Sequence, residues 1–406
     1  MKIGIIGLGY VGLPLFCSLC SHFKVFGVDI SKDKIKNLNS NFDYTSELDK
    51  EGLNILRENV KNISYEYEIL DDCDVYIITV PTPIDYDKRP NLRALENSVS
   101  SITKFIKKGN LIILESTVYP GATYKYIGKY IEKNTQLKLN KDFGIGFSPE
   151  RINPGDKVHT LKNTIKIISA SSEYYLNKMD LIYSKIISAG IYKTSSIEVA
   201  EATKIMENVQ RDVNIAFMNE FEEILKAMNI DIWEVIEAAK TKWNFLSFTP
   251  GLVGGHCIGI DPYYLIYKSE NNGINPHLIR TAREINERTV SIKALSLLKQ
   301  FTYKKNKKLL LLGITFKPDC PDIRNSKVID MINLLEEFDL DIKIFDPYIK
   351  PERLPKLKLL KNIDEINSNF DLICLTVEHK YFFSKTWENH IIKKDIKDKI
   401  IYLRDL

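Results

Sequence analysis

The fold is decided by Lys2-Ile3-Gly4-Ile5-Ile6-Gly7-Leu8-Gly9-Tyr10-Val11-Gly12, an apolar strand that runs directly into three spaced glycines. Leu13 to about His22 is apolar and favours a helix, and residues 25–28 form a second apolar run that ends at Asp29. A strand, a GxGxxG turn, a helix and a second strand in this order predict a βαβ unit that binds a dinucleotide.

The three glycines of this unit have different expected tasks. Gly7 allows the tight turn, Gly9 lets the backbone approach a pyrophosphate, and Gly12 packs the helix against the strand. Asp29 is expected to bind the ribose hydroxyls, and since no arginine follows it, NAD is favoured over NADP. The alternative is that Asp29 only caps the helix at 31–37. The predicted cofactor-binding residues of this unit are Gly7, Gly9, Tyr10, Val11, Gly12, Asp29 and Lys34.

Polar or proline-bearing segments follow three further apolar strands, at 74–80, 111–114 and 143–147. In a doubly wound sheet, ligands bind outside the carboxyl ends of the strands, so these segments should face one crevice. We expect Pro81, Thr82, Thr117 and Glu150 nearest the nicotinamide, although any of them alone could be a helix cap. The segments are Pro81-Thr82-Pro83, Glu115-Ser116-Thr117 and Ser148-Pro149-Glu150-Arg151.

The middle of the chain predicts one long helix, from Ser195 to about Met228, with a capping-box-like start and an apolar stripe at helical spacing. A helix of this length suits a spine between domains or a dimer interface. Lys204 and Asn208 are four residues apart and therefore lie on one helix face, where they are either functional or simply solvated.

A glycine-rich loop, Gly251-Leu252-Val253-Gly254-Gly255-His256-Cys257-Ile258-Gly259-Ile260-Asp261, places a thiol among four glycines and an aspartate four residues after it. A thiol on such a loop is a candidate covalent nucleophile. The competing interpretation is a turn with a buried, inert cysteine.

A second α/β unit begins at residues 308–313 and continues with strands at 342–346 and 370–376. It lacks the glycine fingerprint, so a second dinucleotide is not expected. Lys317 and Arg324 could pair structurally with Asp319 and Asp322, or reach the phosphates of a ligand. We therefore predict two Rossmann-like doubly wound α/β domains, 1–194 and 301–406, joined by a central helical domain, 195–300, with a long spine helix.

The composition excludes several classes of protein. A net charge of +4 over 406 residues, with Lys mixed among Asp and Glu, argues against nucleic acid as the main partner. No apolar stretch is long enough to span a membrane. The six cysteines are scattered, and Cys17 and Cys20 have CxxC spacing inside a predicted helix without a second ligand pair, so no metal site is expected. These features are typical of a cytoplasmic protein.

Over essentially its whole length the sequence resembles the nucleotide-sugar 6-dehydrogenases of the UDP-glucose/GDP-mannose dehydrogenase superfamily. Within that family it looks most similar to the branch acting on UDP-N-acetylhexosamines. UDP-glucose dehydrogenases have a Ser before the cysteine and a Lys before the aspartate, where this chain has His256 and Ile260. The stretches that carry the resemblance are 7–12 with Asp29, 115–117, 148–151, Glu201-Ala202-Thr203-Lys204 with Asn208, 242–245, 253–264, and Phe316-Lys317 to Arg324.

The resemblance implies a four-electron oxidation of a sugar C6 alcohol to a carboxylate with two NAD⁺. Cys257 would capture the intermediate aldehyde as a thiohemiacetal, which is oxidised to a thioester and hydrolysed. Lys204 and Asn208 would stabilise the anionic oxygen. Asp261, Glu150 and Thr117 are the candidates for moving protons and positioning water, and the sequence does not decide which of them is the base.

The resemblance also implies the ligand contacts, and a homodimer through the 195–228 helix is a separate hypothesis from the length of that helix. Arg324 is expected to reach the NAD pyrophosphate. The expected substrate is UDP-GalNAc or UDP-GlcNAc, in capsule or O-antigen synthesis, with UDP-ManNAc or UDP-glucose as alternatives. The other possible functions are those of a two-electron hydroxyacid-type dehydrogenase and of a non-catalytic nucleotide-sugar-binding protein. The UDP-sugar contacts are expected at Glu150, Arg151, Lys204, Asn208, Phe248, Gly254, Phe316, Lys317 and, as a weaker match, Arg404.

Overall fold

The computed structural model describes residues 1–45, 47–151, 160–301 and 307–406. The chain forms two compact units, one of residues 1–207 with 263–274 and the other of 208–262 with 275–406. The long helix α7 (Ile197–Ala227) contributes to both units. Among the described residues, no helix is long and apolar enough to cross a membrane.

The first unit is built on an eight-stranded sheet in the order β3-β2-β1-β4-β5-β6-β7-β8. Neighbouring strands are parallel except β6 and β7, which are antiparallel. The first six positions follow the strand order of a doubly wound dinucleotide-binding sheet. The strands are β1 (Lys2–Ile6), β2 (Lys24–Val28), β3 (Ile63–Ser64), β4 (Val75–Ile78), β5 (Asn110–Leu114), β6 (Phe143–Phe147), β7 (Lys166–Ala170) and β8 (Ile191–Lys193).

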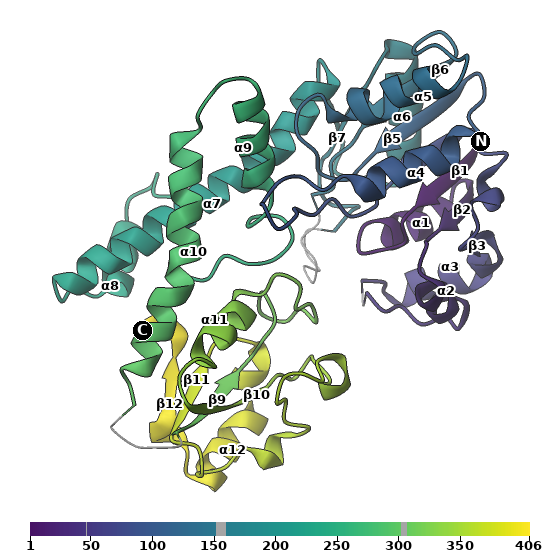
Figure 1. Cartoon of the computed structure of the whole chain (residues 1–406). Helices are drawn as coiled ribbons and strands as arrows, with labels where there is room; N and C mark the ends of the chain where they lie inside the picture. The colour runs from purple at the N-terminus through teal and green to yellow at the C-terminus, as the bar shows by residue number, and fades with distance from the viewer. Residues whose placement is uncertain (46, 152–159, 302–306) are drawn as a thin grey trace. The chain divides into compact units, whose positions relative to one another are not determined.

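Helices cover this sheet, as Figure 1 shows for α1, α4, α5 and α6. The central strands are buried on both faces and therefore read as continuous apolar runs, with Ile3, Ile77 and Leu111 fully buried. The helices of this unit are α1 (Gly12–Cys20), α2 (Lys32–Asn39), α3 (Lys50–Asn59), α4 (Arg93–Thr103), α5 (Lys129–Asn134), α6 (Glu173–Tyr183), most of α9 (Asp261–Asn271) and the first part of α7.

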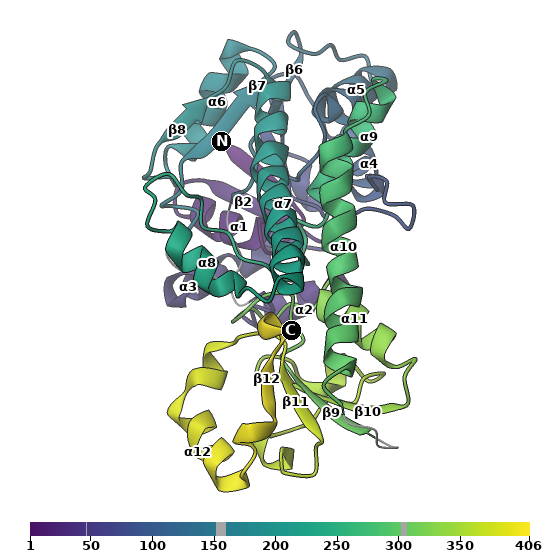
Figure 2. The ribbon, with the colours of Figure 1, turned by 90° about the vertical axis from the view of Figure 1, so that its left-hand side faces the viewer.

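The second unit contains a four-stranded parallel sheet in the order β10-β9-β11-β12. Figures 1 and 2 show its part of α7 beside α10, and ion pairs such as that of Asp212 with Arg283 join the two helices. Its elements are β9 (Lys307–Leu312), β10 (Leu340–Phe345), β11 (Leu372–Leu375), β12 (Ile400–Tyr402), α8 (Ile232–Ala239), α10 (His277–Leu298), α11 (Lys327–Leu335), α12 (Lys385–Lys394) and the rest of α7.

The turn after β9 repeats the turn after β1 in its hydrogen bonds. Gly7 and Gly313 have φ of 95° and 94°. The N–H of Leu8 donates to Asp29 Oδ2 at 3.0 Å, and the N–H of Ile314 donates to Asp346 Oδ2 at 2.8 Å. The two aspartates occupy equivalent places, directly after β2 and after β10.

The two turns differ in what else holds the aspartate. Asp29 lies 3.3 Å from the Lys34 ammonium, whereas Asp346 lies 3.2 Å from Nε2 of the fully buried His379. Burial alone would raise the pKa of Asp346, but the hydrogen bond from His379 lowers it below its ordinary value. The second aspartate is therefore part of the domain interior.

The predicted fold class is confirmed: two Rossmann-like α/β sheets and a helical middle with one long helix. The expected helix at 195–228 is α7. The sequence did not indicate the antiparallel pairing of β6 with β7. The division at 194/195 and 300/301 stays a prediction, because the compact units divide the chain differently.

Candidate active site

The glycine turn after β1 has the geometry that its three glycines predict. Gly7 has φ of 95°, a conformation that side chains rarely adopt. A Cβ at Gly12 would lie 1.8 Å from the carbonyl oxygen of Gly7, so the helix can approach the strand only without a side chain. A Cβ at Gly9 would meet nothing within 4 Å, so this backbone borders open space.

The N-terminus of α1 is available to a ligand. Val11 is its N-cap residue, and no side chain caps the helix. The backbone N–H groups at the start of the helix, after Tyr10 and Val11, can therefore donate to a phosphate. Together with the open space at Gly9 and the acid after β2, these features fit the diphosphate and ribose of NAD.

Asp29 supports the glycine turn and does not cap α2. Its Oδ2 accepts from the N–H of Leu8 at 3.0 Å and from Lys34 Nζ at 3.3 Å. Its Oδ1 accepts from the N–H of Ser31 at 2.9 Å. Ser31 is the N-cap residue of α2, so the helix-cap interpretation of Asp29 was wrong.

The tips of β4 and β5 lie together, as their positions at the carboxyl edge predict. Thr82 donates from Oγ1 to the carbonyl of Thr117 at 2.8 Å, and Ser116 donates to the carbonyl of Val80, next to Pro81, at 2.5 Å. The hydroxyl of Tyr264, in α9, donates to the carbonyl of Thr82 at 2.8 Å. Thr82 and Thr117 are therefore fixed relative to each other.

Glu150 follows β6 and is held by charged and backbone donors. Its Oε1 accepts from the N–H of Arg151 at 2.6 Å, and its Oε2 accepts from Lys166 Nζ at 3.2 Å. The Arg151 guanidinium pairs with Glu207 of α7 at 2.6 Å. Residues 152–159 lie outside the described part of the chain.

Glu201 anchors the turn of α7 that carries Lys204. It is fully buried and accepts hydrogen bonds from the N–H groups of Gly121 and Thr123, at 2.5 and 2.8 Å. Burial raises the pKa of Glu201 to about 7, against the effect of these donors. Lys204 itself is 8% exposed, and the part of the chain that the structure describes gives its ammonium no carboxylate partner.

The raised pKa of Glu201 predicts a pH-dependent stability. Its folded pKa of about 7 exceeds the ordinary 4.5, so its contribution to the free energy of unfolding is complete below pH 4.5 and is lost as the pH rises through 7. Relative to Glu201→Gln, the free energy of unfolding of the wild-type protein should fall by up to about 3 kcal/mol as the pH rises across this range. Urea unfolding of both proteins at pH 5 and pH 8 measures the difference, and identical pH dependences would contradict it.

In the second unit, Asn208 of α7 and Asp261 are in direct contact. Asn208 donates from Nδ2 to Asp261 Oδ2 at 2.5 Å, and Asp261 is 2% exposed. The N–H groups of Ile260 and Asp261 both donate to the carbonyl of Cys257, at 3.0 and 2.8 Å. Cys257 and Asp261 therefore lie in one turn, and Asn208 contacts that turn from α7. These are the three predicted catalytic residues of this unit.

Cys257 is exposed, whereas Cys17, Cys73, Cys320 and Cys374 are buried and Cys20 is partly buried. Burial raises the pKa of the thiols of Cys20 and Cys73 to about 12, which keeps them protonated. The interpretation of Cys257 as a buried, inert cysteine is therefore wrong, and its thiol is the accessible one.

The cysteine loop, residues 251–261, is hydrogen-bonded to the loop that follows β9. The N–H of Gly255 donates to the carbonyl of Asn325 at 3.1 Å, and Asn325 Nδ2 donates back to the carbonyl of Gly255 at 2.8 Å. A Cβ at Gly254 would lie 2.6 Å from the Asn325 carbonyl oxygen, and one at Gly255 would lie 2.7 Å from the Phe316 ring. Both glycines are needed for this close approach.

A second connection joins the same two loops. Nε2 of His256 lies 3.1 Å from Asp322 Oδ2, and Arg324 Nη2 lies 2.6 Å from the same oxygen. Burial alone would raise the pKa of Asp322, but the hydrogen bonds from His256 and Arg324 hold it well below its ordinary value. The structural pairing of Arg324 with Asp322 is present, and a role of Arg324 toward the cofactor stays a prediction.

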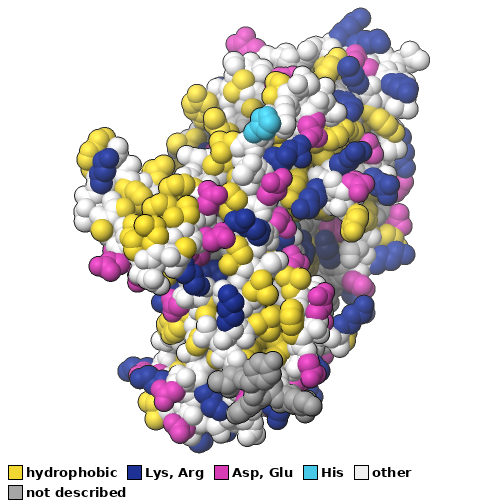
Figure 3. All heavy atoms as spheres, turned by 60° about the vertical axis from the view of Figure 1, so that its left-hand side comes forward, with side chains coloured by type: hydrophobic (Ala, Val, Ile, Leu, Met, Phe, Trp, Pro, Cys, Tyr) yellow, Lys and Arg dark blue, Asp and Glu magenta, His cyan; other side chains and the backbone are white. Residues whose placement is uncertain are grey.

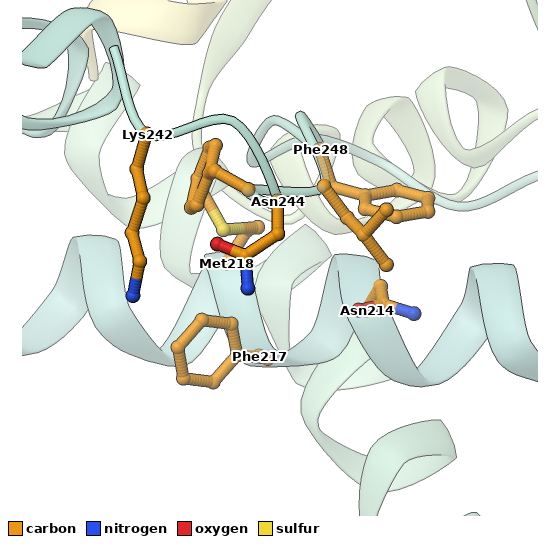
Figure 4. Close-up of a pocket in the computed structure, with 8 residues that line it drawn as sticks. Asn214, Phe217, Met218, Lys242, Asn244 and Phe248 are labelled. Carbon is orange, nitrogen blue, oxygen red and sulfur yellow. The ribbon is translucent and has the colours of Figure 1, made fainter. Parts of the chain in front are cut away.

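The remaining predicted substrate residues of this unit lie on two loops. Lys317 Nζ lies 5.5 Å from the centre of the Phe316 ring. Phe248 lines a cavity of about 300 Å³, where residues 242–248 pass over α7. Figure 4 shows Lys242 and Asn244 pointing toward the helix, Lys242 on the side of Phe217, while Asn214 lies below Phe248. Arg404 pairs with Glu378 at 3.0 Å.

Several residues in these networks were given no role from the sequence. Glu115 and Lys166 form a buried ion pair, at 2.9 Å, behind Glu150. Asn219 of α7 exchanges two hydrogen bonds with the backbone of Gly251, at 2.7 and 3.1 Å, and so fixes the start of the cysteine loop. The signal for Lys166 was a charged residue in an otherwise apolar strand segment, residues 166–168.

Three models of one family match the chain in order. They are the NAD binding domain (residues 1–187), the central domain (198–288) and the UDP binding domain (310–402) of the UDP-glucose/GDP-mannose dehydrogenase family. The chain belongs to this family. It is accordingly an NAD-dependent UDP-sugar dehydrogenase, and the resemblance seen in the sequence and the predicted cofactor are confirmed.

Relatives of similar length support the assignment. The UDP-N-acetyl-D-glucosamine 6-dehydrogenase of Pseudomonas aeruginosa is 42% identical over 394 residues, which cover 96% of this chain and 93% of the relative. Protein CapL of Staphylococcus aureus is 42% identical and covers 97% and 93%. The solved UDP-D-ManNAc dehydrogenase of Pyrococcus horikoshii is 30% identical with a TM-score of 0.86, covering 99% and 94%.

Proposed function

We propose that this dehydrogenase oxidises the C6 alcohol of a UDP-N-acetylhexosamine, UDP-GlcNAc or UDP-GalNAc, to the uronic acid. The observation that carries the proposal is the exposed thiol of Cys257, in a turn whose Asp261 carboxylate contacts Asn208 at 2.5 Å. A two-electron dehydrogenase needs no such thiol. The 42% identity to a UDP-N-acetyl-D-glucosamine 6-dehydrogenase over nearly the full chain supports the N-acetylated sugar.

The proposed chemistry uses the thiol to retain the aldehyde. Bound NAD⁺ supplies the hydride acceptor for each oxidation. The Cys257 sulfur adds to the aldehyde carbon and forms a thiohemiacetal, whose oxidation leaves a thioester. Attack by water then forms the carboxylate carbon–oxygen bond, breaks the carbon–sulfur bond and returns the thiol.

Each remaining candidate has a role suited to its surroundings. Lys204 and Asn208 would donate to the oxygen at C6 as it gains negative charge. Glu150 would take the proton of the attacking water, with Asp261 and Thr117 as the other candidates for proton transfer and water positioning. Arg151, Phe248, Gly254, Phe316 and Lys317 are the proposed contacts to the UDP-sugar.

The substrate proposal is tested by kcat/KM for UDP-GlcNAc, UDP-GalNAc, UDP-ManNAc and UDP-glucose, with NADH formation as the readout. We expect an N-acetylated gluco- or galacto-sugar to give the highest value, with two NADH per sugar. A clear preference for UDP-glucose would overturn the proposal, whereas a preference for UDP-ManNAc would retain the reaction and change the sugar. No NADH with any of the four would instead favour a binding protein.

We also propose a homodimer through α7. Figure 3 shows hydrophobic side chains gathered over α7 and α8, and contiguous exposed hydrophobic patches are typical of interaction sites. Sedimentation at micromolar concentration is expected to give the mass of two chains, and a stable monomer would contradict the proposal. The exposed large hydrophobic residues in the last third of α7 and after it include Phe217, Ile224, Met228, Ile230, Trp243 and Leu246.

The cellular setting is a further part of the proposal. We place the enzyme in the cytoplasm, where nucleotide-sugars would be oxidised before polymer assembly, and the six free cysteines are consistent with a reducing compartment. The relative CapL supports a role in capsule synthesis. O-antigen synthesis is the alternative pathway.

A further inference from the structure

A buried ion cluster lies behind Glu150 in the first unit. The ammonium of Lys166, the first residue of β7, lies 2.9 Å from Glu115 Oε2 and 3.2 Å from Glu150 Oε2. Tyr183, the last residue of α6, donates to Glu115 Oε1. The cluster therefore joins residues that are far apart in the sequence: one after β5, one after β6, one in β7 and one in α6.

The reversed direction of β7 places Lys166 at the functional edge of the sheet. Because β7 is antiparallel to β6, with Phe147 opposite Ser169, the start of β7 lies beyond the end of β6. In a parallel β7 the same residue would lie at the opposite edge. Ligands of such sheets bind beside the carboxyl ends of the parallel strands, so the cluster adjoins the expected crevice.

Burying charges is costly even when they are paired, so a buried ion cluster at this edge points to a functional purpose. Burial alone would lower the pKa of Lys166, but the carboxylates of Glu115 and Glu150 raise it, and Lys166 remains an ammonium. Burial raises the pKa of Glu115.

The members of the cluster are not equally buried. The side chains of Glu115 and Lys166 are 0% and 3% exposed, whereas that of Glu150 is 11% exposed. In the proposed function, Glu150 is also the residue that accepts the proton of the attacking water. The geometry therefore places a fixed cation behind the one carboxylate that reaches toward the surface.

We propose that Lys166 is a positioning residue, whose ammonium orients the Glu150 carboxylate, while Glu115 and Tyr183 hold the ammonium. This inference rests on the proposed function, in which Glu150 accepts the proton of the water that attacks the thioester. The titratable groups of the described residues that face Lys166 are Glu115, Glu150 and Tyr183. Arg151, next to Glu150, is paired with Glu207.

The inference predicts opposite effects from two neighbouring substitutions. Lys166→Gln removes a cation beside Glu150, so Glu150 binds a proton more readily and the acidic limb of the kcat–pH profile moves up by about one pH unit. Glu115→Gln removes a like charge, so the same limb moves down. A shift of about one pH unit lowers the ionised fraction of a base at a fixed pH by at most about 10-fold, so kcat of Lys166→Gln at neutral pH should fall by no more than about 10-fold.

The experiment measures NADH formation with UDP-GlcNAc and NAD⁺ across the pH range for wild type, Lys166→Gln, Glu115→Gln and Glu150→Gln. Glu150→Gln tests the proposed function by itself: it should abolish the acidic limb, and an unchanged limb would show that Glu150 is not the base. If Glu150→Gln removes the limb while Lys166→Gln and Glu115→Gln leave it in place, the inference about Lys166 is wrong.

A purely structural role would give a different pattern. Both substitutions would then lower kcat or stability without moving the limb in opposite directions. Circular dichroism and titration with NAD⁺ establish that each variant is folded. If Lys166→Gln does not fold, Glu115→Gln decides the question. The acidic limb of its kcat–pH profile is expected to move to lower pH. An unchanged limb would overturn the inference.

Discussion

Replacing Cys257 by alanine is expected to lower steady-state NADH formation from the UDP-sugar by at least about 10⁴-fold, the scale on which removal of a nucleophile acts. The alanine leaves the loop and its bonds to Asn325 in place but removes the sulfur that retains the aldehyde. Without the thiohemiacetal, the second oxidation has no covalent substrate. The measurement is NADH absorbance per sugar consumed.

Cys20→Ala is the matched control for this variant. Cys20 is a partly buried thiol on α1, and burial raises its pKa to about 12. This control should keep two NADH per sugar. Alkylation with iodoacetamide should label Cys257 first in the wild-type protein, because its thiol is the exposed one. Two NADH per sugar at the wild-type rate from Cys257→Ala would refute the covalent mechanism.

Lys204→Met is expected to lower kcat by about 10²- to 10³-fold with a small change in KM for the UDP-sugar. Lys204 is 8% exposed, and its ammonium has no carboxylate partner in the described part of the chain, so its charge is not committed to an ion pair. Its proposed partner is the oxygen at C6, whose negative charge grows only as the reaction proceeds. The loss therefore falls on kcat.

The control for Lys204→Met is Thr203→Ala on the same turn of α7. Thr203 bonds the carbonyl of Val199 within the helix, so its loss should leave kcat near the wild-type value. Lys204→Arg keeps the charge in a different shape and should recover only part of the rate. A rise in KM with an unchanged kcat in Lys204→Met would mean that Lys204 binds substrate and transition state equally, contrary to the proposal.

The sequence predicts best the parts of the site that depend on local geometry. The tasks of Gly7, Gly9 and Gly12 follow from their spacing, and the backbone around them has the expected form. The meeting of Thr82 with Thr117 follows from one rule, that parallel strands end at a common edge. Both inferences need only the order of strands and helices.

Contacts between distant segments could not be predicted in this way. His256 and Asp322 are 66 positions apart, and Lys166 and Glu115 are 51 apart. Their meeting depends on how loops pack and, for Lys166, on the antiparallel entry of β7 into the sheet. The exposure of Cys257 also depends on packing, because a glycine-rich loop can bury or present a thiol with equal ease.

The matching turns at Gly7 and Gly313, each tied to an aspartate after the second strand, show one backbone arrangement used for two purposes. The positions of Gly9 and Gly12 correspond to Thr315 and Pro318 in the turn after β9. The first turn has the glycine fingerprint for a dinucleotide. In the second turn His379 bonds the aspartate, and the loop that follows supports the reactive cysteine loop.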